Sequence, residues 1–371
     1  HKMTSQARQH PYNDKDASRY FEEKREVRAH FLAVNGVDPA SMVPVSGDCS
    51  CRRFFRVRYG SGTAILMESL PDDNPNATPG HKFGDFVRIA RHLRAQGISV
   101  PAILAEDWAN AQLLVEDFGE MTFKRALETG DVSRETLYSL GVDILRELGR
   151  SADAPAIGLP DYFQSHIHEA RKALVNWYLP ATQGRTPEDW LINDYVHVCD
   201  RIMADVPEPE TGFVHGDFHL QNLMWRDDQQ GLARCGVLDF QGAMNGPLAY
   251  DLANLLEDAR VHVSPDLREH MLARYCVDMD QAGADNFRQW YRVLGTQFHC
   301  RVAGQFIRLA VNDGKTRYLE FLPIVEAYLR EALDDPLLSP LAAWFDKQGI
   351  TLDSDGEISR ERLAWLGGSL R

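Results

Sequence analysis

The sequence has no long apolar run and no surplus of positive charge. Although 44% of its 371 residues are hydrophobic, no uninterrupted apolar stretch reaches the 18 residues typical of a membrane-spanning helix. Acidic residues outnumber basic ones by 54 to 40, which gives a formal net charge of -14. Proteins that bind nucleic acid usually gather Lys and Arg on one face. We therefore expect neither a membrane-spanning protein nor one that binds nucleic acid.

Cysteine is also sparse. The six cysteines form no Cys-x-x-Cys motif, and Cys49 and Cys51 are too close together for a routine disulfide. The first sixteen residues are polar and contain no apolar core of a secretory signal. These absences argue against a disulfide-stabilised secreted domain, and we expect reduced thiols in a cytoplasmic protein.

Hydrophobic patterning divides the chain into a strand-rich first third and a mostly helical remainder. In the first third, apolar spacing predicts helices at 17–35 and 83–96 and strands at 43–45, 54–59, 63–67, 102–105 and 112–116. After Gly119, helical periodicity predicts helices at 134–149, 162–178, 188–204, 248–258, 266–281, 286–311 and 318–333. Short strands are expected there at 213–214, 223–225 and 235–239. No internal repeat is present, and no function follows for residues 336–371.

This order of elements predicts an α+β protein with two lobes. Residues 1–116 would form a small N-terminal lobe with five strands and one main helix. Residues 117–371 would form a larger, mostly helical C-terminal lobe. The hinge is expected near Glu116-Asp117-Phe118-Gly119. Because ligands often bind where two lobes meet, we expect the active site there.

The segment His215-Gly216-Asp217-Phe218-His219-Leu220-Gln221-Asn222 carries the clearest chemical signal, together with Leu238-Asp239-Phe240. A loop aspartate, an asparagine five positions later and an aspartate after the next strand are the minimal set for phosphoryl transfer from ATP. Asp217 would accept the proton of a substrate hydroxyl, and Asn222 and Asp239 would bind Mg²⁺ through oxygen atoms. Residues 226–231 would form the turn that brings these two metal ligands together.

Other interpretations of this segment are weaker. His215 and His219 are four residues apart, but no Glu follows His215 as in the zinc motif His-Glu-x-x-His. A metallophosphoesterase would share Gly-Asp-x-His but would need a downstream Gly-Asn-His, which is absent. A purely structural loop with two surface carboxylates is the plain alternative. We expect His215 to organise the loop by hydrogen bonding to backbone near Asp217.

The nucleotide site is predicted less directly. Gly314-Lys315-Thr316 resembles the end of a Walker A loop, but position 309 is Leu rather than Gly and no strand precedes it. A better candidate is the small-residue loop between the first two strands, whose N–H groups would approach phosphates. Its predicted nucleotide-binding residues are Ser46, Gly47, Asp48 and Ser50. Backbone groups of Glu116 and Phe118 would meet the adenine ring.

A basic run follows that loop. Alternation along a strand would place Arg52, Arg56 and Arg58 on one face. We expect one of Arg52, Arg53 and Arg56 to touch phosphate, and Arg53 is included in the predicted nucleotide site. A solvated strand face is the alternative, and it is favoured for Arg58.

The stretches HGDFHLQNLMW and VLDFQGAMNGPLAYDLANLLED closely resemble the aminoglycoside phosphotransferase and choline kinase superfamily. The likeness extends from about residue 25 to 335. It implies a two-lobed, protein-kinase-like fold with a five-stranded antiparallel sheet, and it implies ATP and Mg²⁺ as cofactors. The matching residues are the catalytic Asp217, the metal ligands Asn222 and Asp239, and a structural Asp251.

A narrower resemblance is to the anomeric kinases of bacterial cell-wall recycling, which phosphorylate N-acetylmuramate and N-acetylglucosamine. It is carried by VSGDCSCRRFFRV, LMESLPDD, LLVEDFG and QFHCRVAGQFIRLAVNDGKTRYLEFLP. One departure from the wider family concerns phosphate binding. Kinases usually carry a Lys on the third strand, paired with a helix Glu, but Met67 stands near that position and the facing helix offers Asp85. An Arg of 52–56 or Lys82 would have to substitute.

The expected partner is a small molecule, either a sugar or an aminoglycoside. The lactyl carboxylate of N-acetylmuramate needs a cation, and the resembling segment offers His299 and Arg301. Gln241, directly after Asp239-Phe240, would touch a sugar hydroxyl. Aminoglycosides are polycations and would instead require acidic residues. Two hypotheses remain beside a sugar kinase: an aminoglycoside O-phosphotransferase, and a catalytically decayed kinase-fold binding protein. A protein kinase is disfavoured because no Asp-Phe-Gly or Ala-Pro-Glu segment is present.

Overall fold

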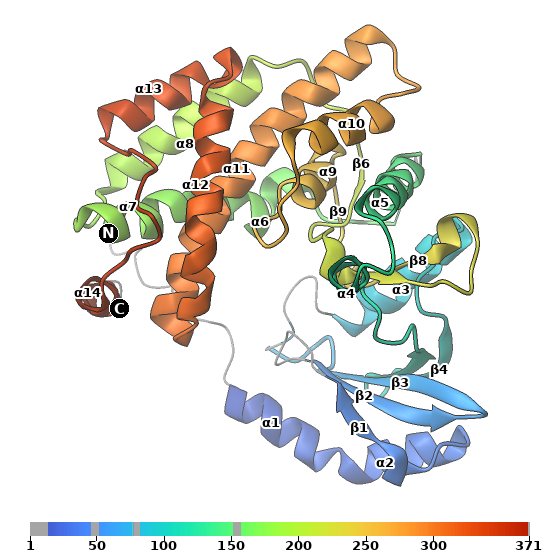
Figure 1. Cartoon of the computed structure of the whole chain (residues 1–371). Coiled ribbons are helices and arrows are strands. Elements are labelled where there is room, and N and C mark those ends of the chain that lie inside the picture. Colours follow the sequence, from blue (N-terminus) through green and yellow to red (C-terminus); the bar gives the residue numbers. More distant parts are fainter. Residues whose placement is uncertain (1–13, 46–51, 76, 78–81, 151–156, 370–371) are drawn as a thin grey trace. The chain divides into compact units, whose positions relative to one another are not determined.

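The computed structural model describes residues 14–45, 52–75, 77, 82–150 and 157–369. Four predicted nucleotide-binding residues lie outside these ranges: Ser46, Gly47, Asp48 and Ser50. No helix within the described residues is both long and apolar enough to cross a membrane. The chain forms two compact units (Figure 1). The first comprises the chain up to residue 144 together with 220–243, and the second comprises 145–219 and 244–371. A lobe boundary after residue 116 stays a prediction.

The first unit is built on a five-stranded antiparallel sheet, as the sequence predicts. Its strands are β1 (Val43–Val45), β2 (Arg52–Tyr59), β3 (Gly62–Ser69), β4 (Ile103–Asp107) and β5 (Gln112–Glu116), in the order β1-β2-β3-β5-β4. Tyr59 pairs with Gly62, so only two residues connect β2 to β3. Gly60, the first of them, has a φ of +57°, which the tight turn requires and glycine adopts without strain.

The register of β2 and β3 assigns the arginine run to two faces. Arg52 pairs with Ser69, and Arg53 pairs with Glu68. Paired residues share a face, and successive residues alternate. Arg52, Arg56 and Arg58 therefore lie on one face with Met67, as predicted, while Arg53 lies on the other.

Helices cover both faces of the sheet (Figure 1). On the face of Arg53, Phe31 and Leu32 of α2 (Arg25–Val34) pack against Val57 and Leu66. The single helix predicted at 17–35 is two helices, α1 (Asp14–Glu23) and α2, because the helix is interrupted at Lys24. The predicted helix at 83–96 is α3 (Phe83–Ala95).

A short hairpin completes the first unit. The 3₁₀ turn η5 (Leu220–Asn222) leads into β7 (Leu223–Trp225), which pairs with β8 (Cys235–Val237). This confirms the hairpin predicted around residues 226–231. The remaining elements of this unit are the unpredicted helix α4 (Phe123–Thr129), the 3₁₀ turns η1 (Pro39–Ser41) and η6 (Gly231–Arg234), and most of α5 (Arg134–Gly149).

The second unit is mostly helical. Its longer helices are α8 (Asp189–Ala204), α9 (Ala249–Leu256), α10 (Pro265–Tyr275), α11 (Gln281–Asp313), α12 (Leu322–Leu333), α13 (Ser339–Lys347) and α14 (Arg360–Ser369). The 33-residue α11 contacts both α9 and α12 (Figure 1). Short 3₁₀ turns are η7 (Thr316–Phe321) and η8 (Pro336–Leu338).

One helix prediction for this unit is wrong, and one strand was missed. The helix expected at 162–178 is a series of short turns: η2 (Tyr162–Gln164), α6 (His166–Glu169), η3 (Ala170–Lys172), the π-helical η4 (Leu174–Tyr178) and then α7 (Leu179–Gln183). Ser165, whose hydroxyl accepts from the His168 N–H, caps a fresh start in the middle of that stretch. The strand β9 (Met244–Pro247) was not predicted, because Asn, Gly and Pro disfavour strands. It forms by pairing with β6 (Thr211–Val214).

Candidate active site

The loop that carries Asp217 is held by a buried carboxylate. Asp251, near the start of α9, accepts the N–H of His215 at 2.7 Å and the N–H of Gly216 at 3.0 Å. Gly216 has a φ of +93°, which a glycine tolerates best. The Nδ1 atom of His215 accepts the N–H of Asp217 at 3.1 Å. The loop-organising role expected for His215 is therefore confirmed, as is the structural role of Asp251.

We expect Asp251→Asn to weaken this anchor without abolishing folding. Asparagine keeps one oxygen acceptor, so one of the two buried N–H groups loses its partner, which costs about 1–3 kcal/mol of unfolding free energy. Urea denaturation of the variant measures the loss. The matched control is Asp205→Asn, which changes an exposed residue after α8. Equal stability of Asp251→Asn and wild type would contradict the anchoring role.

Asp217 is exposed to solvent and lies beside His219. Its side chain is 53% exposed, and its Oδ1 lies 3.2 Å from Nε2 of the buried His219. Desolvation by nearby protein atoms would raise the pKa of Asp217. The hydrogen bond and charge of His219, followed by the charges of His215 and Arg301, outweigh it and lower that pKa below its ordinary value. Asp217 is therefore ionised at neutral pH, as a proton acceptor must be.

Two arginines contribute to the field around Asp217. Arg301 of α11 is half-buried, its guanidinium lies 5.2 Å from the ring centre of Phe298, and its Nε has no hydrogen-bond partner among the described residues. Burial would lower the pKa of Arg260, but Asp258, which it binds through two nitrogens, and then Asp217 raise it. The sequence singled out Arg301 but not Arg260, which follows α9 without any motif.

Asn222 and Asp239 meet in the first unit. Nδ2 of Asn222 lies 3.5 Å from Oδ2 of Asp239, and the backbone N–H of Leu238 donates to the Asn222 carbonyl at 2.9 Å. The β7–β8 hairpin brings the two residues together across the 17 positions between them, as predicted. Asp239 has a φ of +55°, an uncommon conformation for a residue other than glycine. Such backbone strain is concentrated at functional sites.

Two further side chains contact the Asp239 carboxylate. Gln241, which is buried, donates from Nε2 to Oδ1 at 2.6 Å. Nη2 of Arg52 lies 3.9 Å from the same oxygen. Phe240, between the aspartate and the glutamine, is fully buried and its ring lies 5.0 Å from that of Phe86 on α3. The predicted sugar contact Gln241 is thus a direct partner of the predicted metal ligand.

The donor set fits Mg²⁺. A carboxylate and an amide supply hard oxygen ligands, and Mg²⁺ is usually held by one or two carboxylates together with substrate phosphates rather than by an all-protein cage. Consistently, no cluster of three or more His, Cys, Asp or Glu side chains suited to a metal occurs within the described part of the chain.

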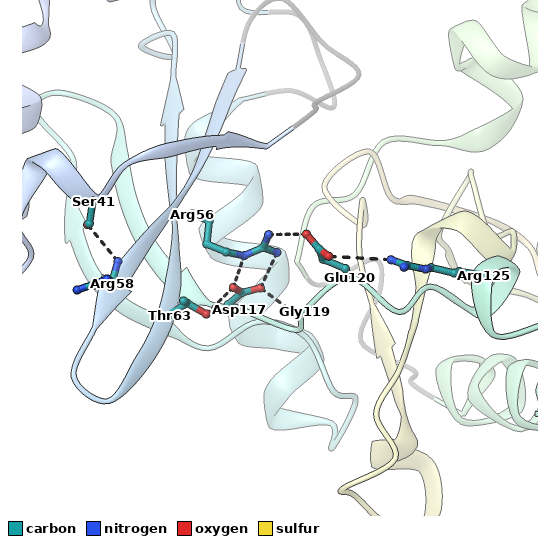
Figure 2. A network of polar contacts seen from close by, with 8 residues as sticks. All are labelled: Ser41, Arg56, Arg58, Thr63, Asp117, Gly119, Glu120 and Arg125. Atoms are coloured by element: carbon teal, nitrogen blue, oxygen red, sulfur yellow. Dashed lines mark hydrogen bonds and ion pairs between the residues drawn. The ribbon is translucent and has the colours of Figure 1, made fainter. Parts of the chain in front are cut away.

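A polar network lies at the predicted hinge (Figure 2). Asp117 accepts from Arg56 Nε at 2.7 Å, from Thr63 Oγ1 at 2.7 Å and from the Gly119 N–H at 2.8 Å. Burial would raise the pKa of Asp117, but these bonds lower it overall. Arg56 also donates to Glu120 at 2.9 Å, so this arginine is fully engaged at the hinge. The sequence did not predict this role for Asp117.

The other predicted nucleotide contacts lie near this network. The Glu116 side chain accepts from Arg226 at 3.2 Å and from the Ala102 N–H at 3.2 Å. The ring of Phe118 lies 4.2 Å from the Arg226 guanidinium and covers Gly236, where any Cβ would clash with it. Arg53, on the opposite sheet face from Arg52, lies 4.7 Å from the ring centre of Phe21.

His299 lies deep in the second unit. It is 1% exposed, its Nε2 lies 3.0 Å from Glu257 Oε1, and its ring stacks on Tyr328 at 4.8 Å. Burial would raise the pKa of Glu257, but the hydrogen bond and charge of His299 lower it overall. Of the two predicted carboxylate-binding residues, Arg301 is therefore the one whose charge acts on Asp217.

Comparison with known proteins shows the family of this chain. A model described as the phosphotransferase enzyme family, APH, matches residues 41–288, well over half of the chain. The N-acetylmuramate/N-acetylglucosamine kinase of Caulobacter vibrioides is 31% identical over 353 residues, which cover 88% of this chain and 96% of the relative. A protein of the same name from Pseudomonas aeruginosa is 32% identical over 304 residues, which cover 80% of this chain and 85% of the relative.

Solved structures share the fold. An ethanolamine kinase from Plasmodium vivax superposes with a TM-score of 0.54 and 13% identity, covering 88% of this chain and 95% of that one. A spectinomycin phosphotransferase solved with ADP and spectinomycin superposes with a TM-score of 0.53 and 14% identity, covering 87% of this chain and 98% of that one. The predicted α+β, protein-kinase-like fold is confirmed. From the family match and the identity to its relatives, we conclude that this chain is a member of the phosphotransferase enzyme family.

Proposed function

We propose that this enzyme is a kinase that transfers the γ-phosphoryl group of ATP, with Mg²⁺, to a sugar hydroxyl. The preferred acceptor is the anomeric hydroxyl of N-acetylmuramate or N-acetylglucosamine, and the process it serves is cell-wall recycling in the cytoplasm. The observation that carries the proposal is the anchored, ionised Asp217 in a loop that continues into the Asn222–Asp239 pair. The names of the relatives support the choice of sugar.

In the proposed mechanism Asp217 accepts the proton of the attacking hydroxyl. His219 and the backbone bonds to His215 and Asp251 fix its position before the substrate arrives. Asn222 and Asp239 would hold Mg²⁺ through their oxygen atoms. The bound metal would neutralise charge on the nucleotide phosphates, and positioning with electrostatic stabilisation supplies most of the catalysis in this reaction class. Asn222 follows Asp217 by only five positions, and we propose that both act on the same phosphoryl group.

The charges around Asp217 favour an acidic sugar over an aminoglycoside. Arg301 and Arg260 both interact electrostatically with Asp217. A polycationic antibiotic would be repelled by the guanidinium of Arg301, whereas a lactyl carboxylate would be attracted. The charge of Arg260 is balanced by Asp258. Arg301 offers the bidentate fork that binds carboxylates well. We propose that Arg301 binds the acceptor carboxylate, and Gln241 and His299 stay candidate acceptor contacts.

Arg301→Ala is expected to weaken mainly the binding of the acceptor that carries a carboxylate, N-acetylmuramate. Loss of one charge-assisted contact should raise the KM for N-acetylmuramate by about tenfold, which corresponds to about 1.4 kcal/mol. The KM for N-acetylglucosamine, which has no lactyl group, should change by less than about threefold. Steady-state kinetics on both sugars measures the difference. Equal effects on the two sugars would contradict carboxylate recognition by Arg301.

A substrate screen tests the function itself. Consumption of ATP with Mg²⁺ is measured with N-acetylmuramate, N-acetylglucosamine, kanamycin, choline and homoserine. The proposal predicts turnover with the first two sugars. Turnover with kanamycin alone would show an aminoglycoside phosphotransferase instead, and silence with all five would favour a decayed, non-catalytic binding protein. Retention of Asp217, Asn222 and Asp239 argues against that last outcome.

A further inference from the structure

We infer that Arg52 is the cation that grips the nucleotide phosphates in this enzyme, in place of the third-strand lysine. The inference rests on the proposed function, because it assumes a nucleotide at the Asn222–Asp239 pair. It assigns a specific residue to a task for which the sequence offered several candidates.

The third strand has no cation at the expected position. Met67 of β3 is fully buried and pairs with Phe54 of β2 and Leu113 of β5. The helix acid is engaged elsewhere too, because Asp85 of α3 pairs with Arg88 of the same helix at 3.1 Å. The usual Lys–Glu pair is therefore absent. Apolar packing takes the place of the lysine at Met67, and the acid at Asp85 pairs within its own helix.

Arg52 is the buried cation beside the predicted metal ligand. It is the first residue of β2, it lies on the same sheet face as Met67, and its side chain is only 7% exposed. Its Nη2 lies 3.9 Å from Oδ1 of Asp239. A buried charge is costly unless an opposite charge balances it, and here the Asp239 carboxylate does so.

The other arginines of the run lie elsewhere. Arg56 binds Asp117 and Glu120 at the hinge. Arg53 lies on the opposite face, over the ring of Phe21. Arg58 is exposed at the far end of the strand. Arg52 is thus the arginine of the run that lies next to Asp239.

The chemistry of Arg52 suits this task. A guanidinium presents a planar fork of N–H donors that binds phosphate oxygens in pairs, and it stays charged when buried. Without nucleotide, Arg52 is balanced by Asp239. With Mg²⁺ on Asp239, Arg52 would be balanced by phosphate oxygens instead, so the buried charge has a counter-ion in both states.

The test separates nucleotide binding from acceptor binding. Arg52→Gln keeps a polar side chain, although a shorter one, and removes its charge, and Arg52→Lys keeps a charge without the fork. Arg58→Ala, on the same strand and face but exposed, is the matched control. Calorimetric titration gives the Kd of Mg·ADP for each variant, and steady-state kinetics gives the KM values for ATP and sugar. Thermal melting without nucleotide confirms that each variant is folded.

Loss of the charge-assisted phosphate contacts should raise the Kd of Mg·ADP and the KM for ATP by about 10- to 100-fold in Arg52→Gln. The KM for sugar should stay within about twofold of wild type in that variant, as should all constants of Arg58→Ala. Arg52→Lys should recover part of the loss, leaving a rise of about three- to tenfold. If Arg52→Gln fails to fold, Arg52→Lys decides on the same measurements.

Nucleotide affinity within about twofold of wild type in the folded Arg52 variant would overturn the inference, and so would an equal rise in both KM values. If the wild type phosphorylates sugar and Arg52→Gln binds Mg·ADP as tightly as the wild type, only the role of Arg52 is wrong. If the wild type does not bind Mg·ADP, both the role of Arg52 and the proposed function are wrong.

Discussion

Replacing Asp217 by alanine is expected to lower kcat by about 10²- to 10⁴-fold, the contribution typical of general base catalysis. The reason is the loss of the carboxylate that, in the proposed mechanism, accepts the hydroxyl proton. Asp217 is 53% exposed and its backbone N–H, rather than its side chain, is held by His215, so the loop should keep its conformation. Rapid-quench or coupled-assay kinetics at saturating ATP and sugar measures the change.

The Asp217 variant needs a structural control. Asp217→Asn keeps the shape of the side chain and should be as inactive as Asp217→Ala, because an amide cannot accept the proton. Both variants should unfold in urea at the wild-type midpoint and bind Mg·ADP with the wild-type Kd. Turnover within about tenfold of wild type in either variant would show that another group acts as the base.

Asp239→Asn is expected to be nearly as severe, lowering kcat/KM by about 10³-fold or more at moderate Mg²⁺. The change removes the negative charge of the proposed metal ligand and leaves its size. Asparagine is the better test than alanine because Asp239 has a φ of +55°, a conformation that Asn tolerates. Raising the Mg²⁺ concentration should restore part of the activity, which a fold defect would not allow.

Asp228→Asn is the matched control for Asp239→Asn. Asp228 is exposed in the turn of the same β7–β8 hairpin, so its charge is removed from the same segment without touching the Asn222–Asp239 pair. It should retain wild-type kinetics. Wild-type activity in Asp239→Asn, or a Mg²⁺ requirement that does not change, would show that the metal is bound elsewhere.

The catalytic loop was predictable because its signal is local. Asp217, Asn222 and Asp239 lie within 23 positions, counted from 217 to 239, and a short hairpin joins the last two. The strands of the five-stranded sheet and the Gly60 turn were predictable for the same reason, since alternation and turn chemistry act over a few residues. The structural role of His215 was predicted from the loop pattern, and that of Asp251 from the family resemblance.

Contacts between distant segments could not be predicted. Arg52 and Asp239 are separated by most of the first unit's sequence, and nothing in a basic strand pattern says which arginine reaches the carboxylate. The influence of Arg301 on Asp217 likewise depends on how α11 packs. The strand β9 exists because β6 offers it a partner, against the preference of its own residues. In each of these cases the outcome depends on contacts between segments far apart in the sequence.

Phosphate transfer followed by ³¹P NMR shows directly whether Asp217 is needed to phosphorylate the anomeric hydroxyl. Wild-type enzyme, ATP and Mg²⁺ are incubated with N-acetylmuramate or with its methyl glycoside, whose anomeric hydroxyl is blocked. We expect a sugar 1-phosphate and ADP from the free sugar, no sugar phosphate from the glycoside, and neither product with Asp217→Asn. Phosphorylation of the glycoside would contradict the anomeric assignment, and sugar phosphate formed by Asp217→Asn would contradict the catalytic one.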